Sequence, residues 1–151
     1  MKVLIQRVQR GSVSVEGRAI GAIGCGYVVF LGVKQGDTAE DAGYLAEKTA
    51  ALRIFPDEQH RMNRSIMEVG GSILVISQFT LHADTRKGNR PNFLLAASAE
   101  QAKTLYETYV AGLRHILGTE RVVTGQFQAM MVVDISNDGP VTIELKSRSE
   151  Q

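Results

Sequence analysis

Two short, unbroken apolar runs constrain the fold of this chain most. Tyr27–Val33 is a continuous apolar stretch between Gly26 and Gly36, and Ile73–Ile76 is a second run of the same kind. Apolar runs of this length without alternation indicate strands that are buried on both faces. The sequence therefore predicts two central strands inside a layered domain.

Short β-branched segments near the start of the chain also indicate strands. Valine and isoleucine recur there between residues 3 and 15, and Gly11 and Gly17 interrupt the pattern. We expect two short strands from this segment. Farther along, Gly70-Gly71 lies between segments 65–69 and 72–77 and predicts the turn of a β-hairpin.

The last third of the chain predicts another hairpin. Met130–Ser136 and Val141–Lys146 have strand character, and Asn137-Asp138-Gly139-Pro140 between them is rich in turn formers. We expect these four residues to form a hairpin tip. The residues alone leave the isomer of Gly139-Pro140 open, although only about 5 to 6% of X-Pro bonds in folded proteins are cis.

Two segments have helical periodicity. The first begins at Thr38, where Asp41 completes a capping box, and the second begins at Ser98 with Gln101 and ends at Gly118. Many strands with only two helices, not in strict alternation, predict an α+β domain with its helices on one side of β layers. At 151 residues, the chain is expected to be a single domain spanning 1–151.

Charge and cysteine content exclude several classes of function. Seventeen Lys and Arg against sixteen Asp and Glu give a net charge of +1, which excludes a broad polybasic nucleic-acid surface but allows a local patch. One cysteine and three scattered histidines predict no metal site. Early charges and short apolar runs predict a cytoplasmic protein with no signal peptide or membrane span.

Motifs taken singly give weak signals. The glycines of segment 21–26 lack the spacing of a dinucleotide loop, and Cys25 has no catalytic partner nearby. His82, near Asp84, is a conceivable base for a Ser or Thr nucleophile in Ser77-Gln78-Phe79-Thr80, but a structural role for these hydroxyls is the commoner case. Their position is more informative, because a buried strand that ends in a polar segment places it at a rim where sites are commonly built.

Two segments taken together resemble a known family. Ser77-Gln78-Phe79-Thr80-Leu81 and Asn137-Asp138-Gly139-Pro140-Val141-Thr142 resemble the two signature segments of the D-aminoacyl-tRNA deacylases. The similarity covers essentially the whole chain and includes several shorter segments: Ile5-Gln6-Arg7-Val8, Gly32-Val33, Arg53-Ile54-Phe55, Met62-Asn63, Gly88-x-Arg90-Pro91-x-Phe93 and Gly125-x-Phe127. Gln128 and Met130 depart from the family pattern, in which a small and an acidic residue are expected.

The resemblance implies an enzyme that hydrolyses the ester between a D-amino acid, or glycine, and the terminal adenosine of tRNA. It implies no metal or nucleotide cofactor. The implied fold is a three-layer β-β-α domain, and the implied assembly is a homodimer with two sites at its interface. In that arrangement the Gly139-Pro140 bond is cis, its carbonyls enter the partner's pocket, and Arg7 supports this tip. A backbone wall of this kind rejects L-amino acids by steric clash and needs no side-chain pocket.

The same resemblance assigns the chemistry to segment 77–80. Ser77, Gln78, Phe79 and Thr80 would form the catalytic segment, with the Phe79 and Thr80 N–H groups as donors to the developing oxyanion. The nucleophile is either the Thr80 hydroxyl or a water activated by the terminal ribose 2′-OH, and we favour the water because no base is evident beside Thr80.

The basic cluster has a role in the same scheme. Arg86, Lys87 and Arg90 would bind tRNA phosphates, although a solvated face is the alternative interpretation. Two rival functions remain: a non-catalytic tRNA- or RNA-binding module, and an oligomer that binds a small molecule at its interface. Both rivals predict no turnover.

Overall fold

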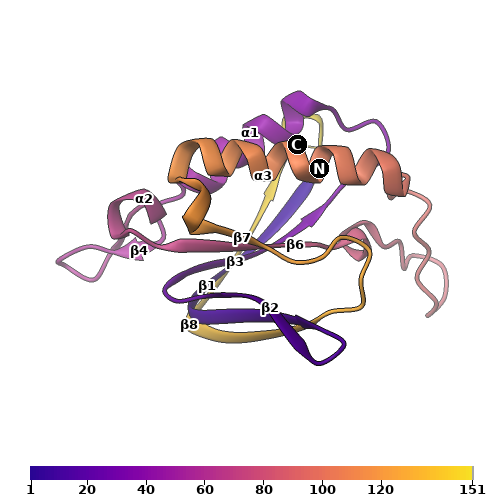
Figure 1. The fold of residues 1–151 in the computed structure, drawn as a ribbon. Helices are drawn as coiled ribbons and strands as arrows, with labels where there is room; N and C mark the ends of the chain where they lie inside the picture. The colour runs from indigo at the N-terminus through magenta and orange to yellow at the C-terminus, as the bar shows by residue number, and fades with distance from the viewer. Residues whose placement is uncertain (151) are drawn as a thin grey trace.

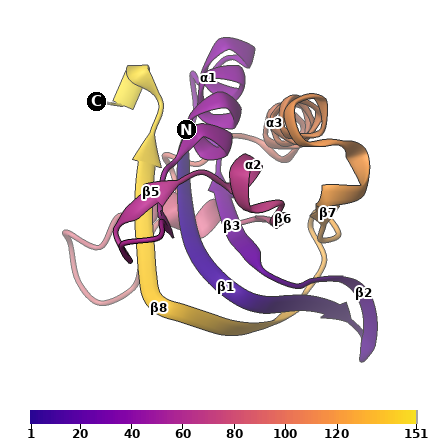
Figure 2. The ribbon, with the colours of Figure 1, turned by 90° about the vertical axis from the view of Figure 1, so that its left-hand side faces the viewer.

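A strongly bent mixed sheet carries two long helices on one face in the computed structural model, which describes residues 1–150 (Figures 1 and 2). The strands are β1 (Lys2–Val15), β2 (Arg18–Ile23), β3 (Gly26–Gly32), β4 (Phe55–Pro56), β5 (Met62–Arg64), β6 (Ser72–Ser77), β7 (Val122–Thr124) and β8 (Val132–Lys146). The helices are α1 (Ala39–Ala51), α2 (Ile66–Val69) and α3 (Ala99–Leu117), with 3₁₀ turns η1 (Phe79–His82), η2 (Thr119–Arg121) and η3 (Arg148–Glu150). Gln151, the last residue of the predicted domain, lies outside the described residues.

The order of the strands makes the sheet almost a barrel. The main path is β2-β1-β3-β6-β7, and β8 pairs with β1. Only the β3–β6 and β6–β7 pairs are parallel. One edge of β1 pairs with β8 along nearly its whole length, whereas the other edge pairs first with β3 and then with β2. The long strands β1 and β8 therefore curve from the upper part of the sheet into the lower part (Figure 2).

Two hydrophobic cores lie on opposite faces of the central strands. Alternate residues of β3 and β6 face the helices and join Leu45, Tyr109 and Leu113 in the larger core: Tyr27, Val29, Leu31, Ile73 and Val75. The intervening residues face the lower strands and form the smaller core with Val8, Val13 and Ile23: Val28, Leu74 and Ile76. The prediction that both apolar runs form strands buried on both faces is confirmed, and so is the α+β class.

Both long helices begin where the sequence predicts, and α3 also ends where it predicts. The Thr38 side chain accepts from Asp41 N–H, and the Asp41 carboxylate accepts from Thr38 N–H at 3.0 Å, which completes the capping box of α1. The Ser98 side chain caps α3, whose Gly118 cap follows Leu117. Helices α1 and α3 pack closely, since a Cβ added at Gly112 would lie 3.0 Å from Ala46 Cβ. Among the described residues, no helix is both long enough and apolar enough to cross a membrane.

The prediction of two short strands before residue 16 is wrong, because β1 runs unbroken through Gly11. Gly11 is buried, and a Cβ there would lie 2.7 Å from Val28 Cγ2. The glycine therefore permits close packing of β1 on β3 and does not end a strand. Gly17, with φ of +76°, does form the turn into β2.

The predicted hairpin at Gly70-Gly71 is also wrong. Residues 66–69 form the short helix α2, which the Ser65–Glu68 capping box begins and Gly70 ends in the left-handed conformation. The following strand β6 pairs in parallel with β3. The capping box at the start of segment 66–69 and the glycine cap after it thus outweigh its strand character.

The C-terminal hairpin is the third correction. Residues 132–146 form one strand, β8, and both of its halves pair with β1. Gln6 pairs with Thr142 and Val8 pairs with Asn137, so residues 138–141 bulge from β8 opposite Arg7. The turn-forming residues therefore create a projection from a continuous strand, and we call residues 137–140 the tip.

Candidate functional site

A cavity of about 690 Å³ opens where β6 ends. Its volume lies within the range of about 300 to 1,000 Å³ that is usual for small-molecule sites. The lining comes from the end of β6, the segment before α3, the first turn of α3 and the segment before β8: Ile76, Ser77, Gln78, Phe79, Phe93, Ala96, Ala97, Ala99, Ala102, Phe127, Gln128, Ala129, Met130, Met131 and Val133. The wall is thus mainly apolar, with a few polar groups at one end.

The polar end is built from the backbone that leaves β6. Gln78 N–H donates to the Leu31 carbonyl at 2.8 Å, which fixes the exit of the strand against β3. The first backbone hydrogen bond of η1 runs from Leu81 N–H to the Gln78 carbonyl at 3.3 Å. The Phe79 and Thr80 N–H groups therefore come before the first donor of this helical turn. Two consecutive amides before the first bond of a helical turn are suitable donors for an anionic oxygen.

Thr80 is adjacent to the cavity, but no described residue acts on it as a base. The Gln78 Nε2 amide donates to Thr80 Oγ1. His82 is buried and does not line the cavity; its Nδ1 lies 3.7 Å from Glu150 Oε1. Burial lowers the pKa of His82, and the Gly32 backbone and Glu150 oppose that shift. An amide donor cannot remove a proton from Thr80, and the histidine ring faces the C-terminal segment instead.

Aromatic side chains form a wall that sequence reasoning did not assign to the site. Phe79 is 55% exposed and contacts Phe93 edge to face, with ring centroids 5.0 Å apart. Phe127 lines the opposite side and packs on Tyr106 at 5.8 Å. Two sequence features pointed to this wall. One is the family-like segment Gly125-x-Phe127, and the other is the pair Gln128 and Met130, which depart from the family pattern and line the cavity.

The tip is held in place by Arg7. Arg7 Nε lies 3.2 Å from the Asp138 carbonyl and 3.0 Å from Asp138 Oδ2, and Arg7 Nη1 donates to the Ile54 carbonyl. The Gly139-Pro140 peptide bond is cis, as predicted, and both residues are exposed. Among residues 1–150, none from the tip lines the cavity of the same chain.

The predicted basic cluster lies outside the cavity on the loop after η1, and all three side chains are exposed. Arg86 forms a two-pronged ion pair with Asp84, at 2.9 Å to Oδ1 and 2.7 Å to Oδ2. Hydrogen bonds from Arg86 lower the pKa of Asp84 to about 2. Lys87 and Arg90 have no recorded ion pair within the described range, so they provide the more available positive charge of this loop.

Comparison with protein families and solved structures gives concordant matches. The model of the family described as D-Tyr-tRNA(Tyr) deacylase matches residues 4–146. A D-aminoacyl-tRNA deacylase of Heliobacterium modesticaldum is 58% identical over 148 residues, which cover 98% of this chain and 97% of that protein. A D-aminoacyl-tRNA deacylase of Halalkalibacterium halodurans is 55% identical over 148 residues, with 98% and 100% coverage.

Two solved structures share the fold. One, described as a c-Myc DNA unwinding element binding protein, has a TM-score of 0.93 at 44% identity and covers 97% of this chain and 99% of its own. The other, described as a probable eukaryotic D-amino acid tRNA deacylase, has a TM-score of 0.81 at 17% identity, with 95% and 97% coverage. The second likeness concerns the fold alone.

Proposed function

This chain belongs to the D-Tyr-tRNA(Tyr) deacylase family, and from that premise we propose that it hydrolyses the ester between a D-amino acid, or glycine, and the 3′-terminal adenosine of tRNA. The products are the free amino acid and tRNA. The observation that carries the proposal is the full-length similarity to deacylases combined with a 690 Å³ cavity at the end of β6. Because aminoacyl-tRNA is made and used in the cytoplasm, we assign the reaction to that compartment.

In the proposed mechanism, the catalytic segment acts mainly through its backbone. The Phe79 and Thr80 N–H groups donate to the oxygen that becomes negatively charged when the ester carbonyl is attacked. One such donor is commonly worth about 10² to 10³ in rate. Ser77 and Gln78 position these amides, since the strand pairing and the Gln78–Leu31 bond fix the chain immediately before them.

Water is the proposed nucleophile. The Thr80 hydroxyl accepts a hydrogen bond from Gln78 Nε2, and that amide is no base. The ribose 2′-OH next to the ester is part of the substrate and lies beside the reacting carbon, so it can orient a water without any protein base. Thr80 then contributes its backbone N–H and a structural hydroxyl.

We propose that chirality is read across a homodimer. The tip projects from β8, is exposed, and does not reach its own chain's cavity in the described residues. In the proposed dimer, the Gly139 and Pro140 carbonyls of one subunit face the amino acid in the cavity of the other. Exposed apolar side chains at the cavity support a covering partner, since Met130 is 91% and Phe79 is 55% exposed. The implied three-layer β-β-α arrangement agrees with the two cores.

The tip is rigid enough for this purpose because Arg7 binds two atoms of Asp138 while it also binds Ile54. A wall of main-chain oxygens on one side of the Cα atom leaves room for hydrogen but not for a side chain. Exchange of hydrogen and side chain at Cα is the difference between D and L amino acids, so this wall admits D-amino acids and glycine. Lys87 and Arg90, with Arg86, are proposed to bind tRNA phosphates outside the cavity.

The direct test is hydrolysis of D-Tyr-tRNA and L-Tyr-tRNA under identical conditions, followed by the release of tyrosine. We expect rapid release from the D ester and release near the uncatalysed rate from the L ester. An RNA-binding module or a small-molecule-binding oligomer would give no enzyme-dependent release from either substrate, and that result would refute the proposed function.

A further inference from the structure

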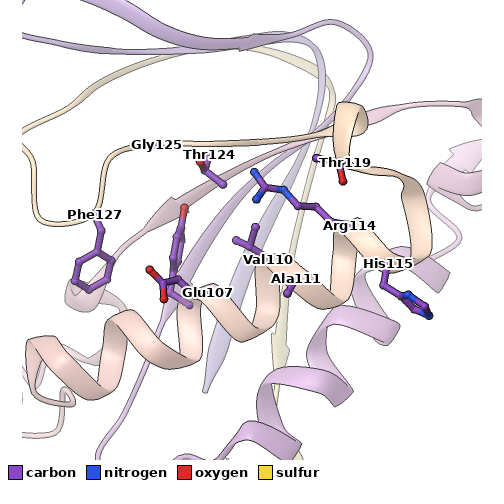
Figure 3. Close-up of a pocket in the computed structure, with 10 residues that line it drawn as sticks. Glu107, Val110, Ala111, Arg114, His115, Thr119, Thr124, Gly125 and Phe127 are labelled. Atoms are coloured by element: carbon purple, nitrogen blue, oxygen red, sulfur yellow. The ribbon is translucent and has the colours of Figure 1, made fainter.

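A second cavity, of about 610 Å³, lies between α3 and the segment that follows η2. Its lining is made of residues from the middle and the C-terminal part of α3, from η2 and from segment 124–127: Tyr106, Glu107, Val110, Ala111, Arg114, His115, Thr119, Thr124, Gly125 and Phe127. Figure 3 shows Arg114 extending from α3 into this space towards Thr124, with Phe127 at the far end. The mechanism proposed above uses none of these residues, and only Phe127 also lines the first cavity.

The two cavities adjoin each other, and we call them together the groove. Phe127 lines both of them. Along α3, Ala99 and Ala102 line the first cavity, and the next three turns line the second. At about 1.5 Å per residue, Arg114 lies about 12 Å farther along the axis of α3 than Tyr106, which packs on Phe127. A strand of nucleic acid that leaves the first cavity at Phe127 therefore has a continuous path to Arg114.

Arg114 carries a donor without an internal acceptor. Its Nε is buried and has no hydrogen-bond partner in the described part of the chain, and its Nη2 makes one long contact, 3.4 Å, to the Val122 carbonyl. The buried Nε is out of reach of a ligand, but the Nη atoms at the cavity make only this one long bond in the described part of the chain, so they can donate to an acceptor that belongs to a ligand. Phosphate oxygens suit the forked donors of arginine best.

The remaining lining fits a nucleotide chain. Tyr106 is a rigid aromatic wall because its hydroxyl donates to the Val75 carbonyl at 2.9 Å. Thr119 and Thr124 supply hydroxyl groups at the Arg114 end (Figure 3). Glu107 is the one carboxylate in the lining; its Oε1 lies 3.9 Å from Lys103 Nζ, which offsets its charge. Tyr106 is only 6% exposed, so it serves as a wall, and the cation with its neighbouring hydroxyl groups is what suits the phosphates of a nucleic-acid strand.

We propose that this groove binds the unpaired 3′ end of the tRNA substrate, and that Arg114 holds a phosphate of a nucleotide preceding the terminal adenosine. This inference rests on the proposed function, because it extends the path of the same substrate. Arg114 is here a binding residue and takes no part in the chemical step. The loop with Lys87 and Arg90 is a separate contact, proposed for phosphates elsewhere on the tRNA.

The test compares two substrates that share the reacting ester: D-tyrosyl-adenosine, which has no phosphate, and D-Tyr-tRNA. For Arg114→Gln, we expect kcat/KM on D-Tyr-tRNA to fall about tenfold or more, through KM, while hydrolysis of D-tyrosyl-adenosine is unchanged. The salt dependence of log KM should decrease by roughly one phosphate contact. Arg114→Lys, which retains the charge but lacks the forked donors, should lie between the wild type and Arg114→Gln.

Lys48→Gln is the matched control. Lys48 and Arg114 both lie in the last turn of a helix, so both variants remove the same favourable interaction with the helix dipole. We expect Lys48→Gln to hydrolyse both substrates as the wild type does. Equal loss on both substrates for Arg114→Gln, or no loss on either, would overturn the groove assignment. Failure of the wild type on both substrates would instead refute the proposed function itself.

Discussion

At the scale of single residues, the proposed catalytic segment, residues 77–80, depends on main-chain groups whose direction is fixed by their neighbours. The bond from Gln78 N–H to the Leu31 carbonyl sets where β6 ends, and the Phe79 and Thr80 amides follow directly. The Thr80 side chain is occupied by Gln78 Nε2. The contributions of side-chain and main-chain groups to the rate of hydrolysis can therefore be separated by substitution.

Thr80→Ala is expected to retain activity within about tenfold of the wild type, since it keeps the amide donor. Phe79→Pro removes one amide donor and is expected to lose about 10² to 10³ in kcat on D-Tyr-tRNA. Phe79→Ala, which removes the ring but keeps the N–H, is the control for the loss of the aromatic wall. A folded Thr80→Ala protein without activity would mean that the threonine hydroxyl is the nucleophile.

The ion pair of Asp84 and Arg86 gives a prediction about pH. Hydrogen bonds from Arg86 lower the pKa of Asp84 to about 2, compared with about 3.9 for an unperturbed aspartate. Because the folded pKa is the lower one, the pair stabilises the loop above about pH 4, and this stabilisation is lost as the pH falls towards 2. An NMR titration of the Asp84 carboxyl should give a midpoint near 2.

The matching variant in that titration is Arg86→Gln. It removes the side-chain donors but keeps the Arg86 backbone bond to Asp84 at 3.0 Å, so the midpoint should rise without reaching the unperturbed value. Lys87→Gln, one residue farther along the loop, should leave the midpoint in place. A wild-type midpoint near 4 would show that the pair does not form in solution.

At the scale of secondary-structure elements, hydrophobic pattern and caps were predictable from the sequence, whereas strand partners were not. The double-sided burial of β3 and β6 and the start of α1 follow from local residue order. The segment Asn137-Asp138-Gly139-Pro140 resembles a hairpin turn, but its flanking halves both pair with β1, and the paired residues are 118 (Ser14 and Val132) to 144 (Lys2 and Lys146) positions apart. No local pattern specifies such a partner, so the tip was recognised as a site through family resemblance and misassigned as a turn.

Close packing between β3 and β6 gives a prediction at this scale. A Cβ added at Gly26 would lie 1.8 Å from the Ser72 carbonyl oxygen, which is main chain and cannot move aside. Gly26→Ala is therefore expected to lower the free energy of unfolding by more than about 3 kcal/mol in urea denaturation. A Cβ added at Gly24, two residues earlier, meets no atom within 4 Å. Gly24→Ala should therefore change the free energy of unfolding by less than about 0.5 kcal/mol. Equal stability of the two variants would contradict the observed packing.

At the scale of the whole molecule, the cavity and the tip lie apart in one chain, and only a second subunit can bring a tip to a cavity in the proposed assembly. This requirement can be tested with two different defects in two subunits. Gly139 has φ of +121°, so Gly139→Ala strains the tip, and a Cβ there would lie 2.9 Å from Val141 Cγ2. We expect the Gly139→Ala protein to hydrolyse L-Tyr-tRNA in addition to D-Tyr-tRNA.

Co-expression of Gly139→Ala with an excess of Phe79→Pro subunits tests the exchange. In a hybrid dimer, the active cavity of the Gly139→Ala subunit receives the unaltered tip of the Phe79→Pro subunit. Hydrolysis of L-Tyr-tRNA per Gly139→Ala subunit should therefore decrease, while hydrolysis of the D ester persists. Unchanged L-ester hydrolysis in verified hybrids would mean that each chain reads chirality by itself.

The pairing of β1 with β8 also determines when the tip can form during synthesis on the ribosome. Arg7 and Asp138 are 131 positions apart. At about 5 to 20 residues per second, β1 emerges roughly 6 to 26 seconds before its partner strand is translated. During that interval the edge of β1 that pairs with β8 has no native neighbour, because β3 pairs with the opposite edge, and an unpaired edge is open to association with other chains. In the proposed mechanism, chiral selection is consequently among the last properties that a newly made chain acquires.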